Sequence, residues 1–531
     1  MLGNKLVLAI NLVCGLSIFF FGYDQGVMSG VNNTPNYVEI MKVGKAVPPQ
    51  FDGDTWGVDV SNSTKLGGIV AIYYLGTLIG ALLGGWLGDK LGRINGVRIG
   101  IVWSIVGASL QASAQNSNWM LCARVINGIG TGHLNAIVPV WSAETSSFSS
   151  RGAFIAFEFT LNIFGVVVAY WLEYGLSYIN NGNSVIRWRF PVAFQIIPLI
   201  GLAIVVNFMP ESPRWLVKAG RDHDALEILG RLRGNGNPND PHAVAEYQDI
   251  KELAETDIGV DTSYIAMFFK SQGDFHIRRR VHLVIWLQIV QEWVGIAAIT
   301  VYQPTIFKQA GFATRKSNWL SGVNEILYML STGIAVLTLD RWGRRISLYW
   351  GAVGQGISMI LAGVFSKLAS EKSSPEFGAA SASFVIIYTF IFGATWLTVP
   401  WVYPTEVWQV QLRAKGNAWG VFGWSIGNGW LTLLCPVMFA SIQEKALYIF
   451  GVVNFASLVM VWAFYPETAN RTLEEIDELF SAPTPWAWDA EKAFQEKSAL
   501  HHNYTKHVGD LSKTILEHPA QIENIEGPTS E

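Results

Sequence analysis

The chain has 531 residues and a formal net charge of −4 at pH 7; 50% of its residues are hydrophobic and 15% are charged. Soluble domains carry roughly 25% charged residues, so this composition excludes an ordinary soluble protein. Long apolar segments indicate a membrane protein, and no nucleic-acid partner is expected.

Six apolar segments in the first part of the chain are long enough to cross a hydrocarbon core about 30 Å thick. The first of them has no small-residue cleavage site, so it is interpreted as a spanning helix and not as a signal peptide. Together they predict an N-terminal six-helix half, residues 1–209. The segments cover approximately 6–29, 66–87, 95–114, 120–142, 153–172 and 189–209.

A polar segment, residues 210–280, interrupts the apolar pattern, and stretches such as HAVAEYQDIKELAE predict short helices within it. A second six-helix half, 281–465, follows. A polar tail, 466–531, ends the chain, and we expect it to be largely disordered after about residue 480. The predicted fold class is therefore an all-α membrane protein with twelve transmembrane helices in two halves. The second set of apolar segments covers approximately 281–307, 319–338, 346–366, 383–403, 416–440 and 447–465.

The distribution of basic residues sets the orientation in the membrane. Short loops on the two sides carry nearly equal numbers of Lys and Arg, whereas both ends of the polar segment are basic, for example at Arg214 and at 278–280. We therefore place this segment and both termini in the cytoplasm. Two glycosylation triplets, beginning at Asn32 and Asn62, would then lie outside, although such triplets are common by chance.

Three charged clusters occur in the first half and recur, in the same order, in the second. The doubling indicates that one unit was duplicated, and parallel repeats of this kind are typical of transporters whose halves move around a central site. The paired clusters are GDKLGR (88–93) with LDRWGRR (339–345), WSAE (141–144) and Arg151 with YPTE (403–406) and Arg413, and PESPRWL (from 210) with PETANRTLEE (from 466).

Taken together, these motifs resemble the sugar porter family of the major facilitator superfamily, and in particular fungal hexose and pentose transporters. The resemblance extends from the first helix to about Leu479. It implies the major facilitator fold, alternating access, and a cytoplasmic gate whose ion pairs link the halves when that side is closed. The alternative is that these charges only anchor helix ends and set topology. The implied gate residues are Asp89, Arg93, Glu144, Arg151, Glu211, Arg214, Asp340, Arg344, Arg345, Glu406, Arg413 and Glu467.

Asp24, in FFFGYDQG, lies inside the first predicted helix. An ionisable residue near the bilayer centre costs at least about 2.5 kcal/mol unless it faces a cavity or a partner. The family resemblance implies that Arg124 is this partner, and that protonation of Asp24 releases it and lets a sugar site form. The alternative is a structural pair in a facilitator without a proton cycle.

A sugar site needs hydrogen-bonding groups around the hydroxyls and an aromatic face against the ring. Gln288 and Gln291 are three residues apart and share one helix face. Glu292 and Glu158 stand where the family usually has glutamines, so glucose is a weaker assignment and a pentose or deoxy sugar becomes plausible; Glu158 could instead be a hydrogen-bond partner within the helix bundle. The expected substrate-binding residues are Gln288, Gln291, Glu292, Trp401, Asn428, Glu158 and Tyr302.

The sequence therefore predicts a transporter that imports a monosaccharide at the plasma membrane, by proton-coupled symport and as a monomer. A facilitative uniporter is the first alternative. A sugar sensor that does not transport is less favoured, because such sensors carry long tails and residues 481–531 are few. The sequence has no nucleophile–base constellation and no metal-ligand set, so neither an enzyme nor a metal site is expected. No cofactor is expected besides the proton as the coupling ion.

Overall fold

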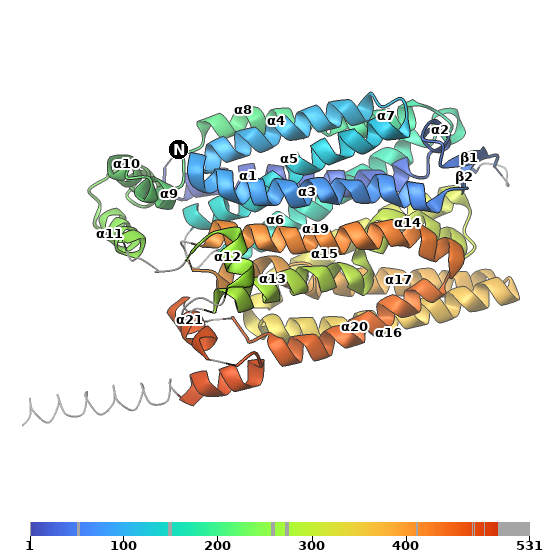
Figure 1. Ribbon diagram of the computed structural model, residues 1–531. Coiled ribbons are helices and arrows are strands. Elements are labelled where there is room, and N and C mark those ends of the chain that lie inside the picture. Colours follow the sequence, from blue (N-terminus) through green and yellow to red (C-terminus); the bar gives the residue numbers. More distant parts are fainter. Residues whose placement is uncertain are drawn as a thin grey trace, which may run out of the picture.

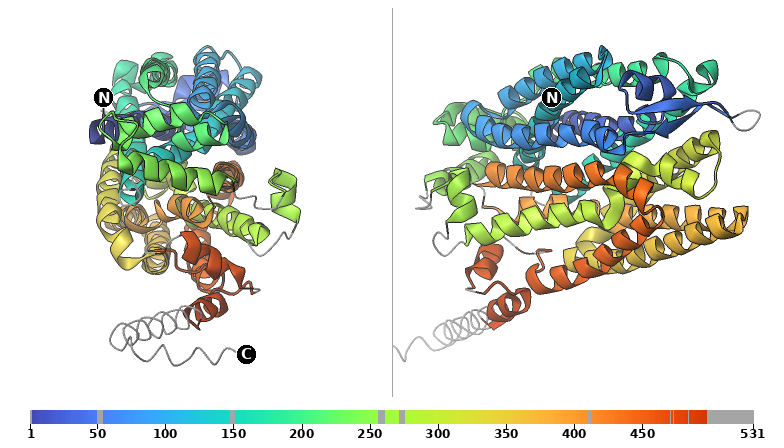
Figure 2. Two further views of the ribbon diagram at one scale, coloured as in Figure 1. Left: turned by 90° about the vertical axis from the view of Figure 1, so that its left-hand side faces the viewer. Right: turned by 45° about the vertical axis from the view of Figure 1, so that its right-hand side comes forward.

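The computed structural model describes residues 2–49, 54–146, 151–255, 261–270, 276–409, 412–469, 471, 473–482 and 484–496. Its long helices lie side by side in two stacked groups, one from each half of the chain (Figure 1). Short helices of the polar segment lie at one end of the bundle, which we call the linker end. A small β-hairpin marks the opposite end, the hairpin end (Figures 1 and 2).

The N-terminal half contains six spanning elements, and its sixth is made of two consecutive helices. Between the first two spans lie α2 (Pro35–Ile40) and the strands β1 (Gly44–Val47) and β2 (Gly57–Val60). The strands pair antiparallel, with Gly44 opposite Val60. The spanning elements are α1 (Asn4–Val31), α3 (Ser63–Leu91), α4 (Arg93–Ala112), α5 (Ser117–Thr145), α6 (Arg151–Leu176), and α7 (Ile186–Phe194) with α8 (Ile196–Val205).

In its described residues the polar segment forms four short helices, and the C-terminal half repeats the six spanning elements. The short helices are α9 (Pro213–Lys218), α10 (Asp222–Arg233), α11 (Pro241–Glu255) and α12 (Tyr264–Phe269). The C-terminal elements are α13 (Ile277–Gln291) with α14 (Ala297–Gln309), α15 (Thr314–Trp342), α16 (Arg344–Lys372), α17 (Pro375–Thr395) with α18 (Val399–Val407), α19 (Arg413–Ser441), α20 (Lys445–Phe464) and the short α21 (Leu473–Ser481).

Ten of the described helices are long and apolar enough to cross a membrane. The other two predicted spans correspond to α4 and α5, which lie within the bundle beside them (Figure 1). Buried polar side chains such as Arg124, His133 and Asn135 interrupt the apolar sequence of α5. The predicted all-α membrane class, with twelve helices in two halves, is therefore confirmed.

Two spans of the C-terminal half are broken near their middle. Between α13 and α14 a π-helical turn, Glu292–Ile296, contains Gly295 at φ +119°, a conformation that a side chain would strain. The second break separates α17 from α18, just before Pro400. Because a break frees backbone carbonyl groups, it needs neighbouring donors, and broken helices in transporters commonly surround the substrate site.

The two halves are in contact at both ends of the bundle, chiefly along α3 and α19. At the hairpin end a Cβ atom on Gly67 would lie 2.5 Å from the carbonyl oxygen of Leu433. At the linker end a Cβ on Gly85 would lie 2.9 Å from the Cβ of Ala418. Between these points the hydroxyl of Thr77 in α3 is hydrogen-bonded to the hydroxyl of Ser425 in α19, at 2.7 Å. The two halves thus meet at both ends of the bundle along this helix pair.

The tail differs from the expectation of disorder after about residue 480. Residues 487–496 form a helix, and Ala490 packs with Leu479 of α21. An ion pair between Arg471 and Glu491 holds this helix to the preceding segment. The sequence prediction missed it because the stabilising contacts are tertiary. The predicted disorder of residues 497–531 stays a prediction, because these residues lie outside the described part of the chain.

Candidate functional site

A narrow cavity lies between the two halves, at the level of the helix breaks. Its volume is about 20 Å³, enough for about one water molecule, so side chains must move before a larger ligand fits. All of its walls come from spanning helices of both halves. The lining residues are Phe21, Gln25, Phe159, Asn162, Ile163, Val166, Gln291, Glu292, Ile296, Thr300, Tyr328, Phe392, Leu397, Trp401 and Trp424.

Four aromatic side chains make one wall of the cavity. The ring centroids of Trp401 and Trp424 are 6.1 Å apart. Phe21 lies 5.1 Å from Trp424, and Phe159 lies 5.2 Å from Trp401. The rings come from α1, α6, α18 and α19, so they bring both halves to one apolar surface. Such a surface suits the carbon face of a flat or ring-shaped ligand.

Two predicted glutamines hold the second helix break in place. Gln291 Nε2 donates to the carbonyl oxygens of Trp396 and Leu397, each at 2.9 Å, and Gln288 Nε2 donates to that of Pro400 at 2.8 Å. The Oε1 atom of each glutamine is buried and has no partner in the part of the chain that the structure describes. Oε2 of Glu292 is in the same situation. Two of these acceptors, on Gln291 and Glu292, therefore line the cavity, whereas Gln288 is not among its lining residues.

The other predicted substrate-binding residues lie at different depths. Trp401 is on the cavity, whereas Asn428 lies behind it and donates to the carbonyl of Trp424 (3.3 Å). Tyr302 donates to the carbonyl of Thr432 (2.9 Å) and lines a second cavity, of about 230 Å³, at the hairpin end. Glu158 is buried in α6 but is not among the lining residues. A role of these side chains in binding stays a prediction.

Several lining residues were not predicted from the sequence. Gln25 follows Asp24 directly, and Asn162 lies one helical turn after Glu158, so their polarity inside apolar segments was an available signal. Aromatic residues gave no such signal, because many face lipid. The residues missed in this way are Phe21, Gln25, Asn162, Thr300, Tyr328 and Phe392.

Asp24 is buried and bound by neutral groups of α5. The amide of Asn127 donates to both carboxylate oxygens at 3.0 Å, and the hydroxyl of Thr131 lies 3.4 Å from one of them. Arg124 is buried nearby: its guanidinium lies 4.4 Å from the ring centre of Tyr73. Among the described contacts of the two residues there is no ion pair between Arg124 and Asp24. The structure thus brings the predicted partners into one region without pairing them.

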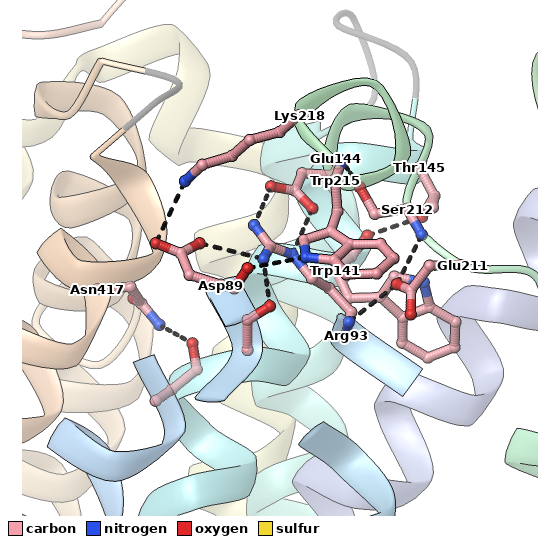
Figure 3. Close-up of polar contacts among 12 residues, drawn as sticks. Asp89, Arg93, Trp141, Glu144, Thr145, Glu211, Ser212, Trp215, Lys218 and Asn417 are labelled. Atoms are coloured by element: carbon pink, nitrogen blue, oxygen red, sulfur yellow. Dashed lines mark hydrogen bonds and ion pairs between the residues drawn. The ribbon is translucent and has the colours of Figure 1, made fainter. Parts of the chain in front are cut away.

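At the linker end of the N-terminal half, Arg93 is the centre of a buried ion-pair cluster (Figure 3). Its Nε and Nη2 atoms donate to the two oxygens of Glu144, at 2.9 and 2.8 Å. Its Nη1 atom lies 3.2 Å from Asp89, which also meets Lys218 of α9 at 3.5 Å. The cluster therefore joins the ends of α3, α4 and α5 to the polar segment.

Glu211 caps the beginning of α4. Its carboxylate accepts hydrogen bonds from the backbone amides of Arg93 (2.9 Å) and Ile94 (3.1 Å). Burial raises the pKa of this carboxyl, and the hydrogen bonds from backbone amides, including that of Ser212, oppose the shift. The PESPR motif thus connects the polar segment to the helix that follows the GDKLGR motif.

The C-terminal half repeats this arrangement. Arg344 donates to both oxygens of Glu406, at 3.3 and 2.5 Å, and lies 3.1 Å from Asp340. Glu467 accepts from the backbone amides of Arg344 (2.9 Å) and Arg345 (3.0 Å) at the start of α16. The sequence duplication is therefore also a duplication of contacts.

The ion pairs described for these clusters lie within one half, or between a half and its flanking segment. The halves meet at this end through other groups, such as the amide of Asn417, which donates to the carbonyls of Asn135 (3.3 Å) and Ala136 (3.2 Å). Arg413 is buried, and Arg345 contacts the hydroxyl of Tyr349. The expectation that these pairs link the halves directly therefore stays a prediction. The side chain of Arg151 lies outside the described residues, and Arg214 is only partly buried beside Ser212.

Two six-helix halves with duplicated end clusters and a central cavity define a transporter of the major facilitator class. The comparison with protein families agrees: residues 10–480 match the family described as "Sugar (and other) transporter". The chain belongs to this family. Its predicted membership is thereby confirmed, and its relatives are transporters rather than enzymes.

Curated relatives and solved structures extend the comparison. The chain is 32% identical to the MFS-type transporter oryC of Aspergillus oryzae over 90% of its length and 86% of the relative's. It is 30% identical to the sugar transporter STL1 of Saccharomyces cerevisiae over 90% and 82%. Among structures, the proton:xylose symporter XylE bound to 6-bromo-6-deoxy-D-glucose is similar with a TM-score of 0.74 and 25% identity, covering 90% of this chain and all of XylE.

Proposed function

We propose that this protein imports a monosaccharide, a hexose or a pentose, by proton-coupled symport through alternating access. The observation that carries the proposal is the position of Asp24. It is buried in α1 beside the cavity-lining Gln25 and is held by the neutral donors Asn127 and Thr131. A carboxyl at such a place is costly unless its charge is neutralised, and a proton can do this.

Coupling would act through α1, because this helix carries both the carboxyl and part of the cavity wall. Phe21 lies three residues before Asp24 and contacts the rings of Trp401 and Trp424 in the other half. Proton uptake would separate Asp24 from Arg124 and allow α1 to pack against the C-terminal half around the sugar. Proton release would restore the attraction and loosen this packing. The unpaired arrangement of Asp24 and Arg124 is the one expected after proton uptake.

A neutral polyhydroxylated ring matches the cavity lining. The free oxygens of Gln291 and Glu292, both on the cavity, accept hydrogen bonds, and sugar hydroxyls donate them. The tryptophans offer a face for the ring carbons. In support, the relatives include a high-affinity glucose transporter of Candida albicans, 29% identical over 72% of each chain. The departures at Glu158 and Glu292 leave the choice between hexose and pentose to experiment.

The proposed location is the plasma membrane, with both termini and the polar segment in the cytoplasm. Its support is the concentration of basic residues at the linker end, for example Lys218, Arg278 and Arg279. The substrate would then enter from the hairpin end. We propose the monomer as the functional unit, because one chain supplies every wall of the cavity.

Reconstituted vesicles separate symport from its alternatives. Wild-type protein should accumulate labelled sugar when the outside is acidic, and Asp24→Asn should lose this accumulation while it still exchanges labelled for unlabelled sugar. Sugar uptake that is independent of the pH gradient, and unchanged in Asp24→Asn, would establish a uniporter. Sugar binding without any flux would establish a sensor. Competition by a panel of hexoses and pentoses would then identify the preferred sugar.

A further inference from the structure

A groove on the outer surface of the C-terminal half is separate from the central cavity and from the charged clusters. It lies at the linker end, between α13 and α20, where Pro485 of the tail closes one side. Its volume is about 430 Å³. Leu283, Met460 and Phe464 supply much of its wall, and Arg279 lies at its rim. It is therefore a largely apolar groove with a cationic end.

The surface around the groove is suited to lipid. Trp286 and Val459 are 55% and 65% exposed on helices long enough to span a membrane, so they face the acyl chains. Trp462, Trp486 and Trp488 stack beside them, with ring centroids 4.5 and 4.9 Å apart. Tryptophans gathered at a helix end are typical of the membrane–water interface. The groove thus reaches from the interface into the acyl region.

Two neighbouring arginines differ in what they bind. Arg280 donates to the carbonyl of Val407 and pairs with Asp477, both at 2.7 Å. Arg279 donates once, from Nη2 to the carbonyl of Pro485 (3.2 Å), and its guanidinium lies 5.3 Å from the ring centre of Phe480. Its buried Nε and Nη1 atoms have no hydrogen-bond partner within the described parts of the chain. A buried guanidinium with free donors calls for an acceptor, and its planar fork fits a phosphate.

We propose that this groove binds an anionic phospholipid, with the phosphate on Arg279 and an acyl chain along Leu283, Met460 and Phe464. The headgroup belongs to the cytoplasmic leaflet, and in this respect the inference rests on the orientation proposed above. Basic pockets between membrane helices on the cytoplasmic side are suited to anionic headgroups. His282 also lines the groove.

Lipid retention by the purified full-length chain tests the proposal. The protein in detergent is equilibrated with equal amounts of phosphatidylserine and phosphatidylcholine and repurified, and the bound lipids are quantified. The wild-type chain should retain phosphatidylserine preferentially. Arg279→Gln should lower this preference about five-fold, which corresponds to about 1 kcal/mol, the contribution of one basic residue near an anionic lipid. Arg278→Gln, at the exposed neighbour that does not line the groove, should retain the wild-type preference.

A second variant keeps the charge of Arg279 and reduces the volume of the groove. Met460→Trp would fill the groove while Arg279 stays in place, and it should also lower phosphatidylserine retention. Gel-filtration behaviour and thermal unfolding report whether each variant is folded. Sugar exchange is measured in a separate assay, so a failure of the transport proposal does not affect the lipid result. Equal retention of both lipids by the wild-type chain, or a wild-type preference in both Arg279→Gln and Met460→Trp, would overturn the inference.

Discussion

Glu211 and Glu467 occupy equivalent positions in the two halves: each accepts hydrogen bonds from the first two backbone amides of the helix that follows a DxxGR motif, α4 or α16. Each glutamate also begins the segment that leaves its half. The duplicated PES and PET motifs therefore fasten the polar segment and the tail to corresponding helix ends. Carboxylates at helix N-termini satisfy free amides and the positive end of the helix dipole.

Replacing either glutamate by alanine should destabilise the protein by about 1–2 kcal/mol, the usual cost of a lost helix cap. Glu211→Gln should cost less, because it keeps an acceptor and burial already raises the pKa of the Glu211 carboxyl. Thermal unfolding in detergent measures these effects, with Glu227→Ala, at an exposed position of α10, as the control. Equal midpoints for Glu211→Ala and Glu227→Ala would contradict the capping role.

The Arg93–Glu144 pair should behave as one unit. Both side chains are buried, so Arg93→Gln leaves the Glu144 carboxylate without its ion-pair partner and should cost about 3–5 kcal/mol. Glu144→Gln should cost less, because Arg93 keeps its ion pair with Asp89. The double variant should cost less than the sum of the single ones, because it removes both charges. Unfolding midpoints of the four proteins form a double-mutant cycle. Strictly additive losses would mean that the two side chains act independently.

Replacing a tryptophan on the cavity should weaken sugar binding, whereas replacing one on the lipid-facing surface should not. Trp424 lines the cavity, whereas Trp430 on the same helix, α19, is 59% exposed. We expect Trp424→Ala to raise the KM for sugar roughly ten-fold, or about 1.4 kcal/mol, through loss of the aromatic face. Trp430→Ala should leave KM unchanged. Uptake at varied sugar concentrations distinguishes them, and equal KM values would remove Trp424 from the site.

The sequence predicted the fold and the duplicated clusters well, because helix length and motif order are local properties of the chain. The cavity was predicted less completely. Gln291 was expected from its polarity, but its bonds to the carbonyls of Trp396 and Leu397 depend on a break in a distant helix. Phe21 was not expected, since nothing local distinguishes an aromatic residue that faces a cavity from one that faces lipid. Which face of a helix meets its neighbour is decided by packing.

The proposed orientation predicts which end of the protein a membrane-impermeant reagent can label from outside the cell. Lys45 is exposed in β1 at the hairpin end, and His223 is exposed in α10 at the linker end. In intact cells, Lys45→Cys should react with an impermeant maleimide, and His223→Cys should react only after the membrane is permeabilised. The background chain carries Cys122→Ser, because Cys122 is exposed on α5 whereas Cys14 and Cys435 are buried. The reverse labelling pattern would invert the topology.

Alternating access requires the hairpin end to open and close, and Gly67 lies where α3 and α19 approach each other closely at that end. A Cβ there would be 2.5 Å from the backbone oxygen of Leu433, whereas a Cβ on the adjacent Gly68 would meet nothing within 4 Å. Backbone cannot yield as a flexible side chain does, so Gly67→Val should hold α3 away from α19 and favour the form that is open at the hairpin end. Gly68→Val has the same added volume and should transport normally.

Two measurements follow from this difference between neighbouring glycines. Sugar uptake by Gly67→Val should fall at least about ten-fold, because a bias of 1.4 kcal/mol toward one conformation already depletes the other by that factor. Gln25→Cys on the cavity wall should react faster with an impermeant reagent from the hairpin side in the Gly67→Val background than in the Gly68→Val background. If both backgrounds transport and react alike, close approach of α3 and α19 at Gly67 is not a step of the transport cycle.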